Sequence, residues 1–145
     1  MKTIREELFS GIDFGSLVSN DSFNEASVRE FIISPMLSRL GYSSEDIILE
    51  RGVQVQTGTQ KHLTLVYADY ILRRGGELFC VIEAKSPRHN VDDAAIIEQA
   101  FSYASHSSVR SEYFAICNGV EFSLYKTDVQ RTLLFRFSLI DIDDH

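Results

Sequence analysis

Residues 67–85 read YADYILRRGGELFCVIEAK, and this stretch carries most of the information about the fold. Two runs rich in aliphatic and aromatic residues flank Arg74-Gly75-Gly76, a composition typical of a β-hairpin. In the second run both alternating sets of side chains are apolar, Leu78, Cys80, Ile82 and Ala84 on one side and Phe79 and Val81 on the other. A strand that is apolar on both faces is covered on both faces, so we expect helices on each side of a central sheet.

The sequence before the hairpin predicts two helices. A short one covers residues 3–9, and a longer one begins at Ser22, which forms a capping-box pattern with Glu25, and ends at Gly41. Pro35 lies inside the longer helix and should kink it, or restart it with Ser34 as a new N-cap.

The remaining sequence supplies strands and one more helix. Asp92-Asp93 suits a helix N-terminus and opens a helix over residues 91–104, while Asn118-Gly119 is a strong turn signal between two strands. Strands are expected over residues 47–56, 63–72, 77–85, 113–117, 120–126 and 133–137. The predicted fold is therefore α/β, a layered sandwich with a central mixed β-sheet flanked by α-helices.

Length and composition bound the class of protein. The 145 residues, 44% of them hydrophobic, fit one compact domain over residues 1–145. No apolar run approaches the roughly 20 residues that a bilayer crossing needs, and the opening MKTIREELF lacks the order of a signal peptide, so a soluble cytoplasmic protein is expected. Cys80 and Cys117 lie inside apolar runs and are interpreted as buried thiols, and the four histidines show no zinc-ligand spacing.

Charge is distributed unevenly. The formal net charge of −7 works against non-specific binding of nucleic acid or anionic membrane by the whole surface. Residues 61–90, however, are net basic, with five basic side chains against three acidic ones: Lys61, Arg73, Arg74, Lys85 and Arg88 against Asp69, Glu77 and Glu83. A polyanion would have to meet the middle of the chain. Arg88-His89 is the better candidate for a phosphate contact, because Arg73-Arg74 at a hairpin tip is usually a solvated turn.

Polar residues at the end of the second hairpin strand could carry chemistry. Glu83 and Lys85 are two positions apart, so both side chains leave the same face of the strand. If the hairpin loop has an odd residue count centred on Gly76, Asp69 lies directly across from Glu83. Two facing carboxylates repel each other and favour a divalent cation such as Mg²⁺, which with a nearby lysine provides the parts for hydrolysing a phosphodiester. The alternative is an ordinary ion pair of Lys85 with Asp69 or Glu83.

Asp69 followed by Glu83-x-Lys85 resembles the PD-(D/E)xK nuclease signature, with Ala68 where many members have proline. Gln99-x-x-x-Tyr103 is similar to the QxxxY element of the restriction subunits of type I restriction-modification enzymes. The segments NEASVREFIISPMLSRLGY (24–42) and YFAICNGVEFSLY (113–125) resemble that family's first helix and its strand-turn-strand. The resemblance thus covers a core of about residues 22–126 and implies a restriction-endonuclease-like fold.

The resemblance also implies roles for individual residues. Asp69, Glu83 and the backbone carbonyl of Ala84 would hold Mg²⁺, with Mn²⁺ as a substitute, and Lys85 would position the attacking water. Gln99 would support the water or the scissile strand, and Tyr103 would touch the nucleic-acid backbone. Glu25 matches a glutamate that the family places near the metal, although the capping box with Ser22 explains it without catalysis.

The function implied is a Mg²⁺-dependent DNA endonuclease domain of a restriction-modification or related defence system. The acidic balance suggests that other subunits or domains supply DNA binding and targeting. The family's ATP-driven translocase would not fit in this chain, which has no GK[ST] loop and is expected to bind no ATP. One alternative is a catalytically silent nuclease-fold module that serves protein or nucleic-acid interaction. Another is a small-molecule-binding α/β domain with a metal in the same acidic pocket.

Overall fold

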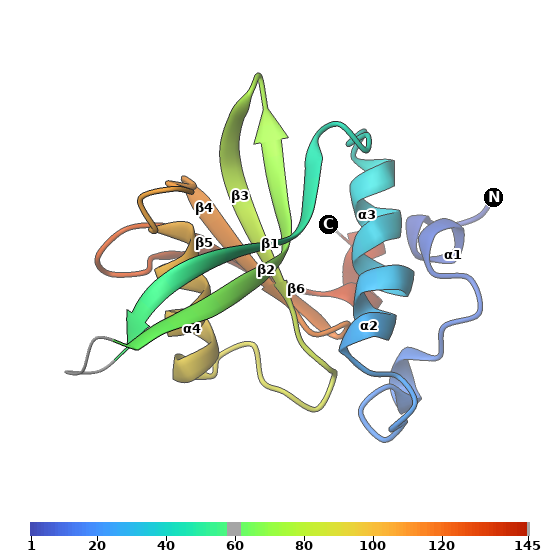
Figure 1. Ribbon diagram of the computed structural model, residues 1–145. Helices are drawn as coiled ribbons and strands as arrows, with labels where there is room; N and C mark the ends of the chain where they lie inside the picture. The colour runs from blue at the N-terminus through green and yellow to red at the C-terminus, as the bar shows by residue number, and fades with distance from the viewer. Residues whose placement is uncertain (58–61, 145) are drawn as a thin grey trace.

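The computed structural model describes residues 1–57 and 62–144 and contains one six-stranded sheet (Figure 1). Its strands follow in the spatial order of the sequence: β1 (Ile47–Thr57), β2 (His62–Arg74), β3 (Glu77–Ala84), β4 (Tyr113–Cys117), β5 (Glu121–Lys126) and β6 (Leu133–Ser138). Strands β3 and β4 are parallel, and the other neighbouring pairs are antiparallel. The predicted α/β fold with a mixed central sheet is confirmed.

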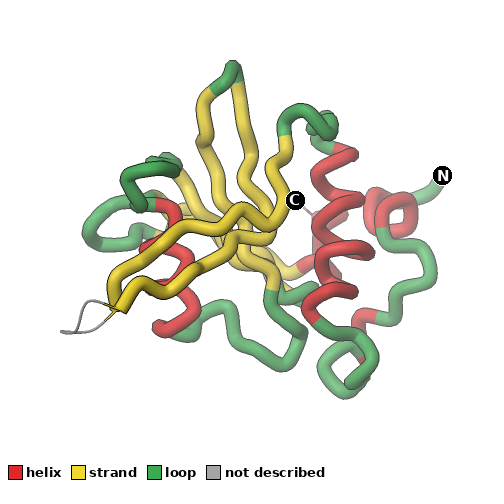
Figure 2. Tube along the Cα trace, in the orientation of Figure 1, coloured by secondary structure: helices red, strands yellow, loops and turns green. Residues whose placement is uncertain are grey.

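Helical segments lie on both sides of this sheet (Figure 2). They are α1 (Ile4–Leu8), α2 (Glu25–Val28), the π turn η2 (Arg29–Ile33), α3 (Ser34–Arg39) and α4 (Ala94–Ala104), with short 3₁₀ turns η1 (Phe14–Ser16) and η3 (Leu139–Asp144). Segments α2, η2 and α3 run on from one another as a single rod, whereas α4 lies across the sheet from them. In the part of the chain that the structure describes, no helix is long and apolar enough to cross a membrane.

The start of the α2 rod differs from the prediction. Asn24 is the N-cap, because its side chain accepts from the Ser27 amide at 3.0 Å while Ser27 Oγ accepts from the Asn24 amide at 3.2 Å. The expected capping box of Ser22 with Glu25 is therefore wrong. Glu25 is the first helical residue and has no capping role.

The rod also passes through Pro35 without restarting. Ser34 is helical, and its amide donates to the carbonyl of Arg29, five residues back, which makes the π turn. Proline has no N–H to donate and crowds the preceding turn, and a wider turn is one way to accommodate it. The expectation that Ser34 would be a new N-cap is wrong, since no side-chain cap is present there.

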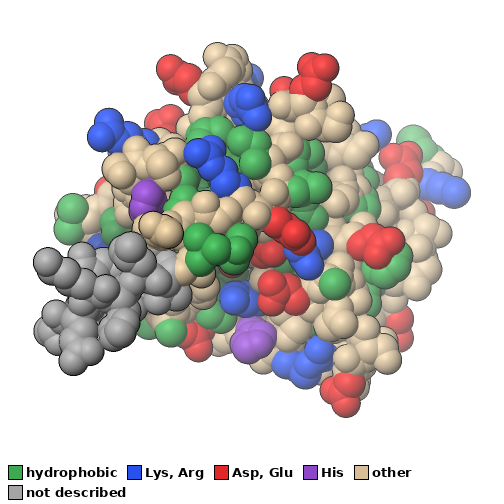
Figure 3. Space-filling model, in the orientation of Figure 1, with side chains coloured by type: hydrophobic (Ala, Val, Ile, Leu, Met, Phe, Trp, Pro, Cys, Tyr) green, Lys and Arg blue, Asp and Glu red, His purple; other side chains and the backbone are tan. Residues whose placement is uncertain are grey.

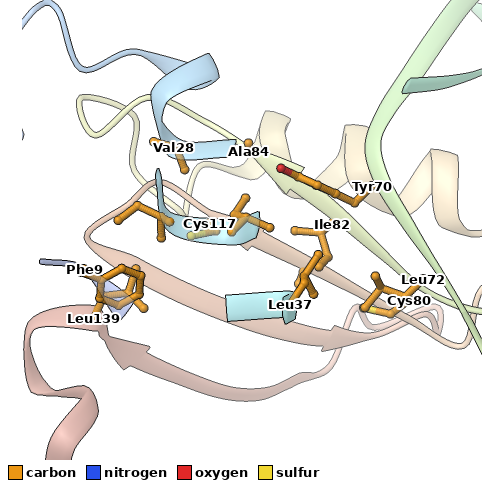
Figure 4. Packing of buried hydrophobic residues seen from close by; sticks show 13 residues of the cluster. Phe9, Val28, Leu37, Tyr70, Leu72, Cys80, Ile82, Ala84, Cys117 and Leu139 are labelled. Carbon is orange, nitrogen blue, oxygen red and sulfur yellow. The ribbon is translucent and has the colours of Figure 1, made fainter. Parts of the chain in front are cut away.

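Two apolar clusters cover the two faces of the sheet. In the first, which is shown in Figure 4, the α2–α3 rod packs Val28 and Leu37 against Ile82 and Cys117 of the sheet. In the second, α4 packs its apolar side against Val81 and its neighbours. Cys80, Val81 and Ile82 thus enter the two cores in turn, as the double apolar alternation predicts. At the start of β3 the prediction is wrong, because Phe79 packs against the first cluster and Leu78 against the second. Both cysteines are buried free thiols, and burial raises the pKa of each to about 12.

The β2–β3 hairpin fixes the position of the polar residues beyond the apolar runs. Its turn consists of Gly75 and Gly76, both with positive φ (58° and 84°), a conformation that glycine adopts without strain. A register shift between Leu72 and Arg73 follows, after which Tyr70 pairs with Ile82. Continued by one residue, this register sets Asp69 opposite Glu83. Up to the pair of Tyr70 with Ile82 the register agrees with the prediction, but a two-residue turn and a bulge produce it rather than an odd loop centred on Gly76.

Candidate active site

The candidate site lies where β2 and β3 separate beyond their last pair, next to the start of the α2 rod. Asp69 comes from β2, Glu83 from the end of β3, and Lys85 is the first residue after β3. The backbone amide of Ala84 donates to Asp69 Oδ2 at 2.8 Å and so fixes the carboxylate across the two strands. The Lys85 amide donates to the carbonyl of Cys117 at 2.9 Å, which extends the β3–β4 pairing past Ala84.

Glu83 is the most perturbed acid of the site. Its side chain is only 5% exposed, and burial, followed by the charge of Asp69, raises its pKa from 4.5 to about 8. Lys85 and Arg29 oppose this shift but do not cancel it. Within residues 1–57 and 62–144 no hydrogen bond or ion pair reaches the Glu83 carboxylate. A buried acid opposite another acid is a costly arrangement that a bound cation would relieve.

Asp69 is also held in an unfavourable environment for a charge. Its side chain is 12% exposed, and burial is the main cause of its raised pKa, which Glu25 raises further. The Ala84 amide, Arg29 and Lys85 act in the opposite direction. Asp69 therefore has protein partners, whereas Glu83 has none among the described residues.

Arg29 and Glu50 belong to the site, although the sequence analysis did not identify them. Arg29 Nη1 lies 2.9 Å from Glu50 Oε1 and 3.4 Å from Asp69 Oδ1. The three side chains line a groove of about 290 Å³ together with Ala26, Glu30, Ser34, Leu49 and Tyr70. In Figure 3, acidic and basic side chains gather on this part of the surface, between the β1–β2 hairpin and the α2–α3 rod.

Glu25 lies beside the carboxylate pair without joining it. Its charge raises the pKa of both Asp69 and Glu83, and it also acts on Arg29. Nevertheless, in the described parts of the chain no three His, Cys, Asp or Glu side chains are close enough to hold one metal ion. The oxygen donors at hand for a cation are thus the carboxylates of Asp69 and Glu83, with the adjacent Ala84 carbonyl. Hard oxygen donors of this kind and number fit Mg²⁺ or Mn²⁺, which keep several waters.

The two helix residues of the QxxxY spacing meet different environments. Gln99 is exposed on α4, whereas Tyr103 is fully buried, and its hydroxyl donates to the carbonyl of Arg51 on β1. Burial also raises the pKa of Tyr103, with a smaller contribution from Glu83. Tyr103 therefore has a structural contact with the β1 backbone, and its contact with a nucleic-acid backbone stays a prediction.

Arg88, expected as a phosphate contact, is used within the protein. Its guanidinium donates to the carbonyls of Asn20 and Phe23 at 3.0 and 3.1 Å, which ties the loop before α2 to the segment after β3. The neighbouring His89 carbonyl accepts from Asn118 Nδ2 at 2.7 Å. These bonds brace the loops around the site.

Comparison with known proteins agrees with the resemblance seen in the sequence. The family model of the type I restriction enzyme R protein N terminus matches residues 24–138. A solved structure described as a fragment of an HsdR subunit of a type I restriction enzyme from Vibrio vulnificus YJ016 superposes with a TM-score of 0.54 at 22% identity, which supports the fold. The match covers 83% of this chain and 26% of that one, so this chain spans about a quarter of the length of that relative.

Comparison with curated protein sequences finds no significant match. The family match is nevertheless decisive, because it extends from the start of α2 to the end of β6 and includes every strand of the sheet. The chain belongs to the family of type I restriction enzyme R protein N-terminal domains.

Proposed function

We propose that the chain is a nuclease domain of the type I restriction-subunit kind, which hydrolyses DNA phosphodiester bonds with Mg²⁺. The observation that carries the proposal is the buried Glu83 carboxylate, which lies within the electrostatic influence of Asp69 and has no protein partner among the described residues. Lys85 comes directly after that strand, and its charge acts on both acids. An acid pair with a cation beside it is the minimum machinery for phosphodiester hydrolysis.

Each residue has a distinct role in this proposal. Asp69, Glu83 and the Ala84 carbonyl hold the metal ion. When bound, Mg²⁺ supplies Lewis-acid polarisation of the phosphate and a more acidic water. The Ala84 amide keeps Asp69 in place through its bond to Oδ2. Lys85 Nζ orients the attacking water and balances the charge that develops on the phosphate oxygens. Gln99, exposed in the middle of α4, supports the water or the scissile strand.

The acidic net charge indicates that other parts of the enzyme bind the DNA and bring it to the site. At a net charge of −7 the chain as a whole repels the phosphate backbone of DNA. Other subunits or domains of a restriction or defence system in the cytoplasm would bring the DNA to the site. The family is consistent with such an assembly, since the HsdR fragment is almost four times as long as the part that this chain matches.

Plasmid nicking tests the proposal. Supercoiled DNA is incubated at low salt with excess protein and either Mg²⁺, Mn²⁺ or EDTA. Lys85→Ala and Asp69→Ala should abolish metal-dependent nicking, while Lys126→Ala, an exposed lysine at the end of β5, should leave it unchanged. Nicking that persists in both site variants would refute the assignment. A wild type that neither nicks DNA nor binds Mn²⁺ would favour a catalytically silent module.

A further inference from the structure

Two local irregularities of the backbone occur at Arg29 and at its ion-pair partner Glu50. The π turn begins at Arg29, and the Arg29 carbonyl accepts both from the Ser34 amide and from the hydroxyl of Tyr70 at 3.0 Å. Tyr70 is the neighbour of Asp69 on β2. On β1, Glu50 has a φ of +51°, which is uncommon for a residue other than glycine. Such irregularities cluster at functional sites, where they place a side chain that regular structure would not.

The result is one guanidinium shared between two carboxylates. Arg29 Nη1 lies nearer to Glu50 Oε1 (2.9 Å) than to Asp69 Oδ1 (3.4 Å). The Asp69 side chain is 12% exposed and the Glu50 side chain 68% exposed, so one partner belongs to the interior of the site and the other to its rim. Arg29 itself is 30% exposed and can follow either partner by a small side-chain rotation.

We propose that Arg29 is the resident counter-cation of Asp69 and that Glu50 is the second position to which it withdraws. The inference rests on the proposed metal site. A divalent cation and Arg29 compete for the charge of Asp69, because two cations beside one carboxylate repel each other. Glu50 lowers the free-energy cost of moving Arg29 away from Asp69, because it binds the guanidinium at the rim. Arg29 is thus a positioning residue that sets the metal affinity of the site.

The arrangement of donors around the two acids supports this division of roles. Both oxygens of Asp69 have a protein donor nearby, Ala84 N–H at Oδ2 and Arg29 at Oδ1. Glu83 has neither, in the described part of the chain. A cation could therefore bind the Glu83 carboxylate without displacing a protein group. At Asp69 it would replace Arg29 as the positive charge beside Oδ1. The bond from Ala84 can remain, because it uses the other oxygen.

Substitutions of Arg29 and of Glu50 should change the Mn²⁺ affinity in opposite directions. Arg29→Gln removes the competing charge and should tighten Mn²⁺ binding by about tenfold, the scale on which a charge within a few ångströms shifts a carboxylate. Glu50→Gln removes the rim position, leaves Arg29 to Asp69 alone, and should weaken Mn²⁺ binding by a similar factor of about ten. Arg29→Lys keeps the charge and should stay near wild type. Arg39→Gln is the matched control, since Arg39 lies on the same rod and pairs with Glu7 away from the site.

The experiment is calorimetric titration of the whole chain with Mn²⁺ alone, without DNA, so that its readout is independent of activity. Asp69→Asn identifies the site, because binding there must fall in this variant. Tighter binding in Arg29→Gln together with weaker binding in Glu50→Gln supports the proposal, as does binding in Arg29→Gln when wild type shows none. If wild type binds at Asp69 and Arg29→Gln binds equally or more weakly, the counter-cation role is wrong while the proposed metal site stands. If neither wild type nor Arg29→Gln binds, both are overturned.

Discussion

The burial of Glu83 makes the stability of the metal-free protein depend on pH in an unusual direction. The folded pKa of Glu83 is raised to about 8, whereas its ordinary value is 4.5. The folded chain therefore holds a proton that the unfolded chain releases between these pH values, and the free energy of unfolding must fall as pH rises through this window. Most acids held by ion pairs in folded proteins show the opposite trend, since their stability contribution is lost on acidification.

The structure sets the size of the effect. A shift from 4.5 to about 8, at about 1.4 kcal/mol per unit, corresponds to a total of roughly 5 kcal/mol over the window. About 3 kcal/mol of this would be lost by neutral pH, which for a chain of this size lowers Tm by about 10 °C. Glu83→Gln carries no titrating proton and should remove most of the slope, so that the variant becomes more stable than wild type at about pH 8.

Thermal unfolding in EDTA from about pH 5 to about pH 8.5 measures the effect. Glu77→Gln, at the exposed start of the same strand, should follow wild type. Millimolar Mg²⁺ should flatten the wild-type curve, because the metal binds the ionised acid, and should leave Glu83→Gln nearly unchanged. Parallel curves for wild type and Glu83→Gln in EDTA would show that Glu83 titrates normally, and the argument for a cation at this site would lose its main support.

Two further substitutions test the braces around the site. Tyr103→Phe removes the hydroxyl that donates to the Arg51 carbonyl and should lower the free energy of unfolding in urea by about 1 to 3 kcal/mol, while Mn²⁺ affinity stays the same. A large loss of metal affinity with normal stability would instead assign Tyr103 to the site itself. Asn118→Ala removes a donor to the His89 carbonyl and the acceptor of the Val120 and Glu121 amides, and should cost about 2 to 4 kcal/mol by the same measurement. A loss of unfolding free energy below about 0.5 kcal/mol, the level typical of surface substitutions, would show that the Asn118 hydrogen bonds do not stabilise these loops.

Elements whose signals are local could be predicted from the sequence. The strand over residues 113–117 has the predicted bounds, and Asn118-Gly119 forms the predicted turn, because the Asn118 side chain caps two following amides and Gly119 takes a φ of +87°. The helix expected from residue 91 begins later, at Ala94, since Asp93 rather than Asp92 caps it through the amides of Ala95 and Ile96. Such differences of a few residues arise where two adjacent residues can serve equally well as a cap.

Features that depend on contacts across the fold could not be predicted in this way. The rod begins at Glu25 rather than near Ser22. With this start, the Val28 side chain faces the core and is fully buried. Tyr103 is buried in the second apolar cluster, and its hydroxyl donates to the carbonyl of Arg51 on β1, 52 positions away in the sequence. Arg29 and Glu50 are 21 positions apart, and nothing local marks them as partners. The one available signal was the spacing of Arg29 four residues after Glu25, which sets both on the same side of a helix.

The left-handed conformation of Glu50 has an electrostatic explanation in the register of β1 and β2. Leu49 pairs with Tyr70 and Arg51 pairs with Ala68, so an uninterrupted ladder would set Glu50 directly opposite Asp69. Like charges directly opposite each other destabilise a sheet, and here Glu83 lies on the other side of Asp69. The positive φ breaks the ladder at this residue, and the Glu50 carboxylate instead meets Arg29 at 2.9 Å. The positive φ of Glu50 costs about 1 kcal/mol, but it avoids the repulsion between Glu50, Asp69 and Glu83. It also gives the Arg29 guanidinium a second partner at the rim of the site.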